Sequence, residues 1–292
     1  MVTRESQNTL EFIRHNIRLD DGTFTKPEST LSMVDNRVFI SSRGILETVF
    51  PGDKSKFRLA DVGCLEGGFA VEFARLGFRV LGIEVRELNI AACNYVKSKT
   101  DLPHLEFVQD NALNIARYGE FDAVFCSGLL YHLDCPKQYL ETLSAVTKKL
   151  LILQTHFSLI SRNDARFRLP TWVPWWTDRL LRKPQPTTHL LSSPSENEGL
   201  PGRWYKEFVG KRSFSIIGRP SFSNRETARR ASWDNYRSFW PQREYLLQAI
   251  RDVGFDLVME EYDHLEPNIA ECLLGGSYRS NLRGTFIGIK TR

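Results

Sequence analysis

The sequence lacks long hydrophobic runs, paired cysteines and a leader of the secretory kind. No apolar stretch approaches the roughly 20 residues that a membrane-spanning helix needs, so we expect no membrane partner. Residues 1–16 are polar and carry charges of both signs, unlike a signal peptide. The five cysteines contain no CxxC pair, and we expect free thiols in a cytoplasmic protein.

Strong net charge is also missing. The 292 residues carry a net charge of +4, which is too small by itself to indicate a nucleic-acid partner. The charge is unevenly spread, however, because residues 158–230 hold 14 Lys and Arg against 6 Asp and Glu. This basic segment is either a solvated surface or a surface that binds an anionic group.

What the sequence does contain is a glycine turn between two apolar runs. Residues 58–63 form an apolar run that includes Asp61, residues 66–68 form a turn before a helical pattern, and residues 79–84 form a second apolar run ending in Glu84. This is the first strand–helix–strand unit of a nucleotide-cofactor fold. Glycine lets the backbone pass close to a ligand, and a terminal acid can accept both hydroxyls of a ribose.

The turn does not suit a dinucleotide. A dinucleotide fingerprint needs a third-position glycine, where this chain has Leu65, and Glu66 is a poor neighbour for a pyrophosphate. These features argue against an NAD-dependent oxidoreductase. Asp61, two residues before Gly63, instead suits a ligand with a positive end. The chain resembles the class I S-adenosylmethionine (SAM)-dependent methyltransferases. Their first motif is matched by Asp61, Gly63 and Gly67, whereas Leu65 departs from it.

The resemblance continues in family order along the chain. Residues 105–112 are predicted to form a third strand ending in an acid, and residues 121–134 a fourth strand and its loop. The Leu-Tyr-His ending of that loop, residues 130–132, is similar to a subgroup that includes tRNA wobble-uridine modifying enzymes. The resemblance implies a SAM site made of Asp61, Gly63, Glu66, Gly67, Glu84, Asp110, Asn111 and Ser127. On a purely structural interpretation, Asp61 would hold the turn and Glu84 would cap the next helix.

The predicted fold class is α/β, a doubly wound Rossmann-like sheet of seven strands, six parallel and the last antiparallel. We expect an N-terminal leader with two helices, residues 10–17 and 38–50, and a large insert between strands five and six. The expected parts are a leader or cap (1–54), a SAM-binding core (55–156), an aromatic and basic insert (157–240) and the end of the core (241–292).

The insert is predicted to act as a lid that recognises substrate, because it holds all six tryptophans. Most of them are expected to form a small core. The residues expected at the substrate are Trp204, Tyr205, Trp233 and, after strand six, His264. Whether residues 183–200 are ordered stays open.

Catalytic residues are expected beyond the carboxyl ends of the strands. His132 is the first candidate for a general base, with Asp134 orienting it, and Tyr131 and His156 are further candidates. The alternatives are a capping or stacking role for His132 and a buried, hydrogen-bonded role for His156. No ligand spacing supports a metal site.

These features predict a SAM-dependent methyltransferase that acts on a hydroxyl or amine of a small molecule, such as a sugar or natural product, and releases S-adenosylhomocysteine. One alternative is an RNA-modifying methyltransferase, since the insert is basic. The other is a SAM-binding partner protein without catalysis. The acceptor atom and the oligomeric state stay open.

Overall fold

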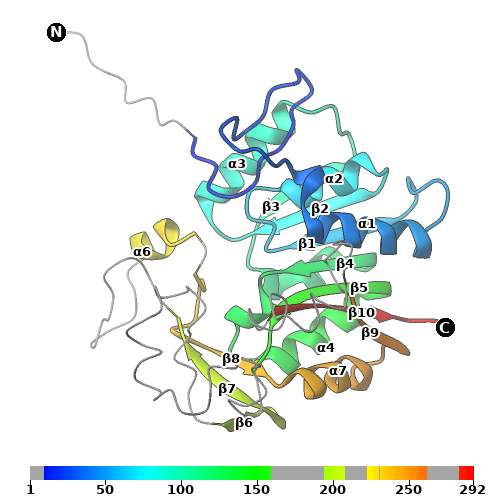
Figure 1. Cartoon of the computed structure of the whole chain (residues 1–292), viewed down its shortest axis with the longest axis vertical. Helices are drawn as coiled ribbons and strands as arrows, with labels where there is room; N and C mark the ends of the chain where they lie inside the picture. Colours follow the sequence, from blue (N-terminus) through cyan, green and yellow to red (C-terminus); the bar gives the residue numbers. More distant parts are fainter. Residues whose placement is uncertain (1–9, 159–193, 208–221, 230, 262–282) are drawn as a thin grey trace, which may run out of the picture. The chain divides into compact units, whose positions relative to one another are not determined.

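The computed structural model describes residues 10–158, 194–207, 222–229, 231–261 and 283–292. These residues fall into two compact units, Met1–Ala112 and Leu113–Arg292, each of which has its own strands and helices (Figure 1). His264, predicted at the substrate, lies outside the described residues. Within the described part, no helix combines the length and apolarity needed to cross a membrane.

Unit 1 contains the predicted strand–helix–strand element. Its parallel strands lie in the order β3-β2-β1, with Asp61 of β1 opposite Gly82 of β2. Helix α2 packs against β1 and β2, and α3 packs against β3. Both β1 and β2 are almost wholly buried, as expected of parallel strands with apolar runs. The elements are β1 (Arg58–Val62), α2 (Gly68–Arg75), β2 (Arg79–Glu84), α3 (Glu87–Ser98) and β3 (Leu105–Gln109).

The leader differs from its prediction in one of two places. The second amphipathic stretch forms helix α1 (Arg37–Val49), which begins where the Asn36 side chain accepts the N–H groups of Val38 and Phe39, after a short turn η1 (Met33–Asp35). The first stretch, residues 10–17, is not a helix, so that prediction is wrong. Its backbone donors are bound by side chains of distant residues instead of by its own carbonyl groups.

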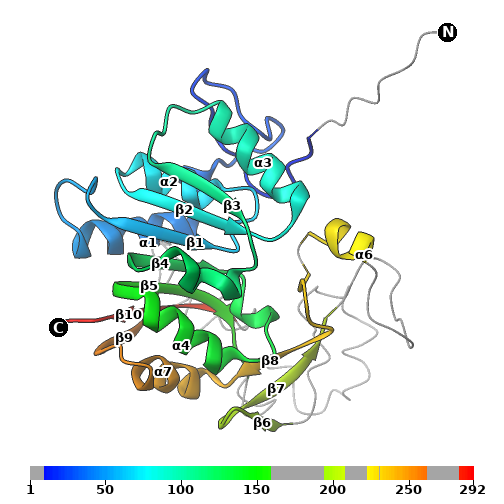
Figure 2. The same cartoon turned by 180° about the vertical axis from the view of Figure 1, so that it is seen from behind.

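Unit 2 contains the remaining strands of the main sheet, in the order β4-β5-β10-β9. Strands β4 and β5 are parallel, and β10 is antiparallel to both β5 and β9. Helices α4 and α7 lie side by side in both views (Figure 2). With unit 1, these are the seven strands of the predicted Rossmann-like fold. The elements are η2 (Ala112–Tyr118), β4 (Phe121–Ser127), η3 (Leu130–His132), α4 (Pro136–Val146), β5 (Thr147–His156), α7 (Arg243–Asp252), β9 (Leu257–Glu261) and β10 (Arg283–Ile289).

The insert contains a small antiparallel sheet in the order β6-β7-β8. Its first hairpin turns at Glu198 and Gly199, both at positive φ, as a tight two-residue turn requires. The Glu198 carboxylate accepts the N–H groups of Lys137 and Gln138, which joins the hairpin to the start of α4. The elements are β6 (Ser195–Asn197), β7 (Leu200–Lys206), α6 (Phe222–Thr227) and β8 (Arg237–Pro241).

Gly82 is required by close packing inside unit 1. A Cβ at this position would lie 2.5 Å from Phe107 and 3.0 Å from the Cys64 sulfur. We therefore expect Gly82→Ala to lower the free energy of unfolding by about 1–3 kcal/mol, measured by urea titration. In Gly44→Ala, the new Cβ meets nothing within 4 Å inside a helix, and stability should rise by up to about 1 kcal/mol. Equal effects of both substitutions would contradict the packing argument.

Candidate functional site

The glycine turn of unit 1 keeps a glycine-like backbone even where the glycine is replaced. Gly63 and Gly67 have φ of +70° and +75°, and Leu65 between them has φ of +54°. A left-handed conformation costs a residue with a Cβ roughly 1–2 kcal/mol. The Leu65 N–H donates to the Glu84 carboxylate at 3.0 Å, which helps to hold this conformation. Leu65 departs from the family motif in its side chain but has a left-handed backbone of the kind that glycine readily adopts.

Asp61 combines deep burial with an open hydrogen-bonding position. The residue is 2% exposed, and its Oδ2 has no hydrogen-bond partner among the described residues. Burial raises the pKa of this carboxyl to about 8, a hydrogen bond from the Ala70 backbone opposes the rise, and the nearby Glu84 adds to it. A cationic ligand group would satisfy the open oxygen and favour the ionised form. The residues present therefore fit the ammonium end of a SAM molecule.

Glu84 organises the backbone around the end of β2. Its carboxylate is 4% exposed and accepts N–H groups from Leu65, Val85 and Arg86. Burial raises the pKa of this carboxyl, and the hydrogen bonds from its neighbours oppose the rise. The residue at the N-cap of α3 is Arg86, so Glu84 is not that cap. Contact between Glu84 and a ribose stays a prediction.

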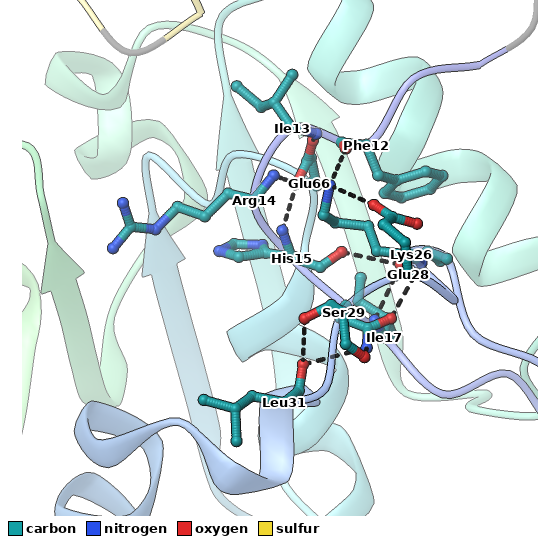
Figure 3. A network of polar contacts seen from close by, with 12 residues as sticks. Phe12, Ile13, Arg14, His15, Ile17, Lys26, Glu28, Ser29, Leu31 and Glu66 are labelled. Carbon is teal, nitrogen blue, oxygen red and sulfur yellow. Dashed lines mark hydrogen bonds and ion pairs between the residues drawn. The ribbon is translucent and has the colours of Figure 1, made fainter.

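Glu66 faces the leader. Its fully buried carboxylate accepts the N–H groups of Ile13, of Arg14 at 3.0 Å and of His15 at 2.7 Å (Figure 3). In return, the His15 Nδ1 accepts the Gly68 N–H at 3.0 Å, at the start of α2. The leader is thus bound to the glycine turn from both sides. Cofactor contact by Glu66, a prediction from the motif, would have to use its backbone.

The adenine-side candidates also adjoin the end of β2. The Asp110 N–H donates to the Glu84 carbonyl at 3.1 Å, and the Asp110 carboxylate accepts the Asn111 N–H at 2.7 Å. Unit 1 therefore brings together all the predicted cofactor residues except Ser127, which belongs to unit 2. Their contact with SAM stays a prediction.

In unit 2, His132 has a carboxylate partner that the sequence did not predict. Its Nδ1 lies 2.9 Å from the Oε1 of Glu207, and the Glu207 side chain is 2% exposed. A carboxylate only accepts hydrogen bonds, so Nδ1 carries the proton and Nε2 is the basic nitrogen. The Nε2 atom has no hydrogen-bond partner within the described part of the chain. The expected orienting acid, Asp134, is replaced in this role by Glu207.

Glu207 is held in turn by residues near β8. It accepts hydrogen bonds from the Ser238 hydroxyl at 2.9 Å and the Ser232 N–H at 3.3 Å. The Ser232 hydroxyl and the Asn235 amide donate to the His132 carbonyl, at 3.0 and 3.1 Å. Both members of the His132–Glu207 pair are therefore fixed. The two residues are 75 positions apart in the chain, so no local sequence pattern connects them. The one signal for Glu207 is its place as an acid directly after a strand of the insert.

The other catalytic candidates, His156 and Tyr131, form a packed aromatic cluster. The His156 ring stacks on Trp240 with centroids 4.6 Å apart and planes at 8°, and Tyr131 meets it edge-on at 4.5 Å. His156 is 8% exposed, which fits the alternative of a buried residue at a strand end. The Trp240 indole N–H donates to the Tyr131 carbonyl at 2.9 Å, which joins β8 to the loop after β4.

The predicted substrate residues of the insert have different surroundings. Tyr205 is buried beside Trp240, and burial raises the pKa of its hydroxyl. Trp204 packs against Phe239, with the Arg237 guanidinium 4.0 Å from its ring centroid. Tyr205 and Trp204 thus belong to the small core of the insert sheet, and substrate contact by them and by Trp233 stays a prediction. Within the described residues, no three His, Cys, Asp or Glu side chains form a metal-binding group.

A family model described as "Methyltransferase domain" matches residues 60–151. Residues 60–151 are a methyltransferase domain. In a comparison with curated proteins, the chain is 35% identical over 85 residues to a protein of Geobacillus sp. (strain WCH70) named as a putative methyltransferase. It is 26% identical over 141 residues to the ubiquinone biosynthesis O-methyltransferase of Acinetobacter baumannii (strain AYE). These alignments cover 28% and 48% of this chain, and only 34% and 59% of the relatives.

Solved structures that align with most of this chain have the same fold. The N-terminal domain of EvdMO1, crystallised in the presence of S-adenosylhomocysteine and D-fucose, matches with a TM-score of 0.59 and 19% identity, over 94% of this chain and 90% of that one. The same domain with S-adenosylhomocysteine bound matches with a TM-score of 0.56, over 87% and 81% of the two chains. The fold predicted from the sequence is confirmed, and the predicted cofactor is the one that this family uses.

The raised pKa of Asp61 makes a pH prediction for the ligand-free protein. Between the ordinary value of 3.8 and the folded value of about 8, the folded state holds more protons than the unfolded state, so stability falls as pH rises. We expect wild type to lose stability relative to Asp61→Asn between pH 4 and pH 8 in urea titrations. Asp53→Asn removes an exposed carboxyl with a lowered pKa and should show no such loss. A flat difference between wild type and Asp61→Asn would refute the shift.

The hydrogen bonds at Glu66 predict a second effect. Glu66→Gln removes the charge that binds the N–H groups of residues 13–15, and charged hydrogen bonds contribute about 1.5–3 kcal/mol. We expect that loss in the free energy of unfolding, with faster proteolysis of the leader. The control Glu47→Gln breaks an exposed ion pair with Arg43, which should cost only about 0.3–0.5 kcal/mol. Leader cleavage at the wild-type rate in Glu66→Gln would count against this anchor.

Proposed function

We propose that this chain is a SAM-dependent methyltransferase that methylates a hydroxyl or amine of a small molecule. The observation that carries the proposal is the His132–Glu207 pair beside the loop after β4. A hydroxyl or protonated amine is a poor nucleophile until it loses a proton, and a histidine oriented by a buried carboxylate removes that proton near neutral pH. In a SAM-binding protein without catalysis, the pair would serve only to join the insert to the loop after β4.

The roles of the chain's own residues follow from their contacts. The open oxygen of Asp61 binds a cationic group of the cofactor, and the glycine turn brings backbone close to it. His132 accepts the acceptor proton at Nε2, while Glu207 holds Nδ1–H and stabilises the imidazolium that forms. The cofactor, when bound, supplies an electrophilic methyl group for in-line displacement.

The similar proteins support a small acceptor. One relative is named for O-methylation in ubiquinone biosynthesis, and one neighbour was crystallised in the presence of a sugar, D-fucose. Both concern small molecules that carry hydroxyl groups.

The experiment that tests the proposal is transfer of radiolabelled methyl from SAM into an extract of the source cells, fractionated by size with and without nuclease. Label in small molecules is expected. Label in a nuclease-sensitive macromolecular fraction would instead favour RNA as the substrate, and the absence of any transfer in all fractions would count against an enzyme.

Variants of the pair separate catalysis from binding. We expect His132→Ala to lower kcat by about 10²–10⁴-fold, the usual contribution of a general base, with the S-adenosylhomocysteine Kd unchanged in calorimetry. Glu207→Gln keeps the shape but loses the charge that stabilises the imidazolium, so kcat should fall by a smaller factor than in His132→Ala. Asp134→Asn is the matched control and should leave kcat close to wild type. Loss of kcat in Asp134→Asn alone would reverse the assignment.

A further inference from the structure

Arg283 places a positive charge at the carboxyl end of β5. It is the first residue of β10 and lies opposite His156 in the antiparallel register. Its Nη2 donates to the Gln154 side-chain oxygen at 2.6 Å, and its guanidinium lies 5.6 Å from the centroid of the Tyr131 ring. The group is half-buried and belongs wholly to unit 2.

The charge of Arg283 has no compensation among the described residues. No carboxylate there lies within ion-pair distance of the guanidinium, and the Nε atom is buried without a hydrogen-bond partner. Gln154 cannot compensate, because its amide is neutral and its oxygen already accepts the Ser127 hydroxyl at 2.9 Å. Leaving a buried donor of a charged group unpaired is costly. An anion bound here would remove this cost.

The residues around Arg283 adjoin the proposed general base within unit 2. Ser127 ends β4, and Gly128 follows it at a φ of +80°. A Cβ at Gly128 would lie 3.5 Å from the Arg283 Nη2 and 3.6 Å from the Tyr131 hydroxyl, so the glycine borders both groups. Tyr131 is also the chain neighbour of His132, and their rings lie 4.3 Å apart. Arg283 is thus one side chain away from the proposed base.

We propose that Arg283, with Gln154 and Tyr131, forms a subsite for a carboxylate of the methyl acceptor, so that the substrate is an anionic hydroxy or amino compound. This inference rests on the proposed function. Arginine suits a carboxylate because its planar fork offers two parallel donors, and Gln154 and Tyr131 hold the fork in place. The cofactor also carries a carboxylate, and the test below distinguishes the two sources.

The test uses the full chain and does not require the acceptor to be known. A small-molecule extract of the source cells is divided on an anion exchanger at pH 8 into retained and unretained pools. Each pool is then incubated with the protein and radiolabelled SAM. We expect transfer into the retained pool. Transfer into the unretained pool alone would overturn the carboxylate subsite but leave the methyltransferase intact, and transfer into neither pool would overturn both.

Variants then assign the anion to Arg283. Arg283→Gln should raise the KM for the retained pool at least tenfold, with a smaller change in kcat and no change in the S-adenosylhomocysteine Kd. Arg283→Lys keeps the charge without the fork and should recover part of the loss. The control Arg237→Gln removes an exposed guanidinium over Trp204 and should leave the KM unchanged.

Two outcomes contradict the assignment. If Arg283→Gln binds S-adenosylhomocysteine more weakly and its KM for the retained pool is unchanged, Arg283 binds the carboxylate of the cofactor and not that of the acceptor. If neither the KM for the retained pool nor the S-adenosylhomocysteine Kd changes in Arg283→Gln, Arg283 has only a structural role. If Arg283→Gln fails to fold, as judged by its thermal melt, the comparison of Arg283→Lys with wild type decides by the same two criteria.

Discussion

The cost of burying a carboxylate shapes the whole neighbourhood of the glycine turn. Three acids, Asp61, Glu66 and Glu84, are each less than 5% exposed, and a buried charge is tolerated only with hydrogen-bond donors around it. Glu84 takes its donors from the end of β2 and from Leu65, and Glu66 takes its donors from residues 13–15. These contacts hold the turn in the left-handed conformations that it needs and attach the leader to it. Of these three acids, only Asp61 has a buried carboxylate oxygen with no hydrogen-bond partner in the described part of the chain, which is the property expected of a ligand-binding acid.

The same cost of burying a carboxylate applies to Glu207 in unit 2. Glu207 is buried and surrounded by donors from Ser232, Ser238 and His132. The charge that stabilises the insert sheet therefore also fixes the tautomer of His132. Arg283 is the opposite case, a half-buried cation that its described neighbours do not neutralise. In our proposals, Glu207 completes a base within the protein, and Arg283 binds an anionic group of the substrate.

Most of the elements could be predicted from the sequence, because their apolar runs are long, are bounded by turn residues and have the periodicity of the element that forms. The strands from β1 to β4 and the helix α1 lie within a few residues of their expected ranges. The first leader stretch was wrongly expected to be a helix. Its apolar spacing suits a helix, but its donors are taken by a glutamate 51 to 53 residues away, and no local pattern contains that contact. His132 was found by its place after a strand, while its partner was misassigned to the nearby Asp134.

By itself, the sequence determined the order of strands and helices, the glycine turn and the acids that follow strands, because these depend on periodicity and on residues close together in the chain. It also placed His132 and His156 at strand ends. Only the tertiary structure decided which partner each buried charged group has. Glu66 binds the leader, Glu207 binds His132 and Arg283 binds Gln154 across separations of 51 to 129 residues. Such pairings follow from how the strands lie beside one another, and the free energy of satisfying a buried charge becomes available only when the chain has folded.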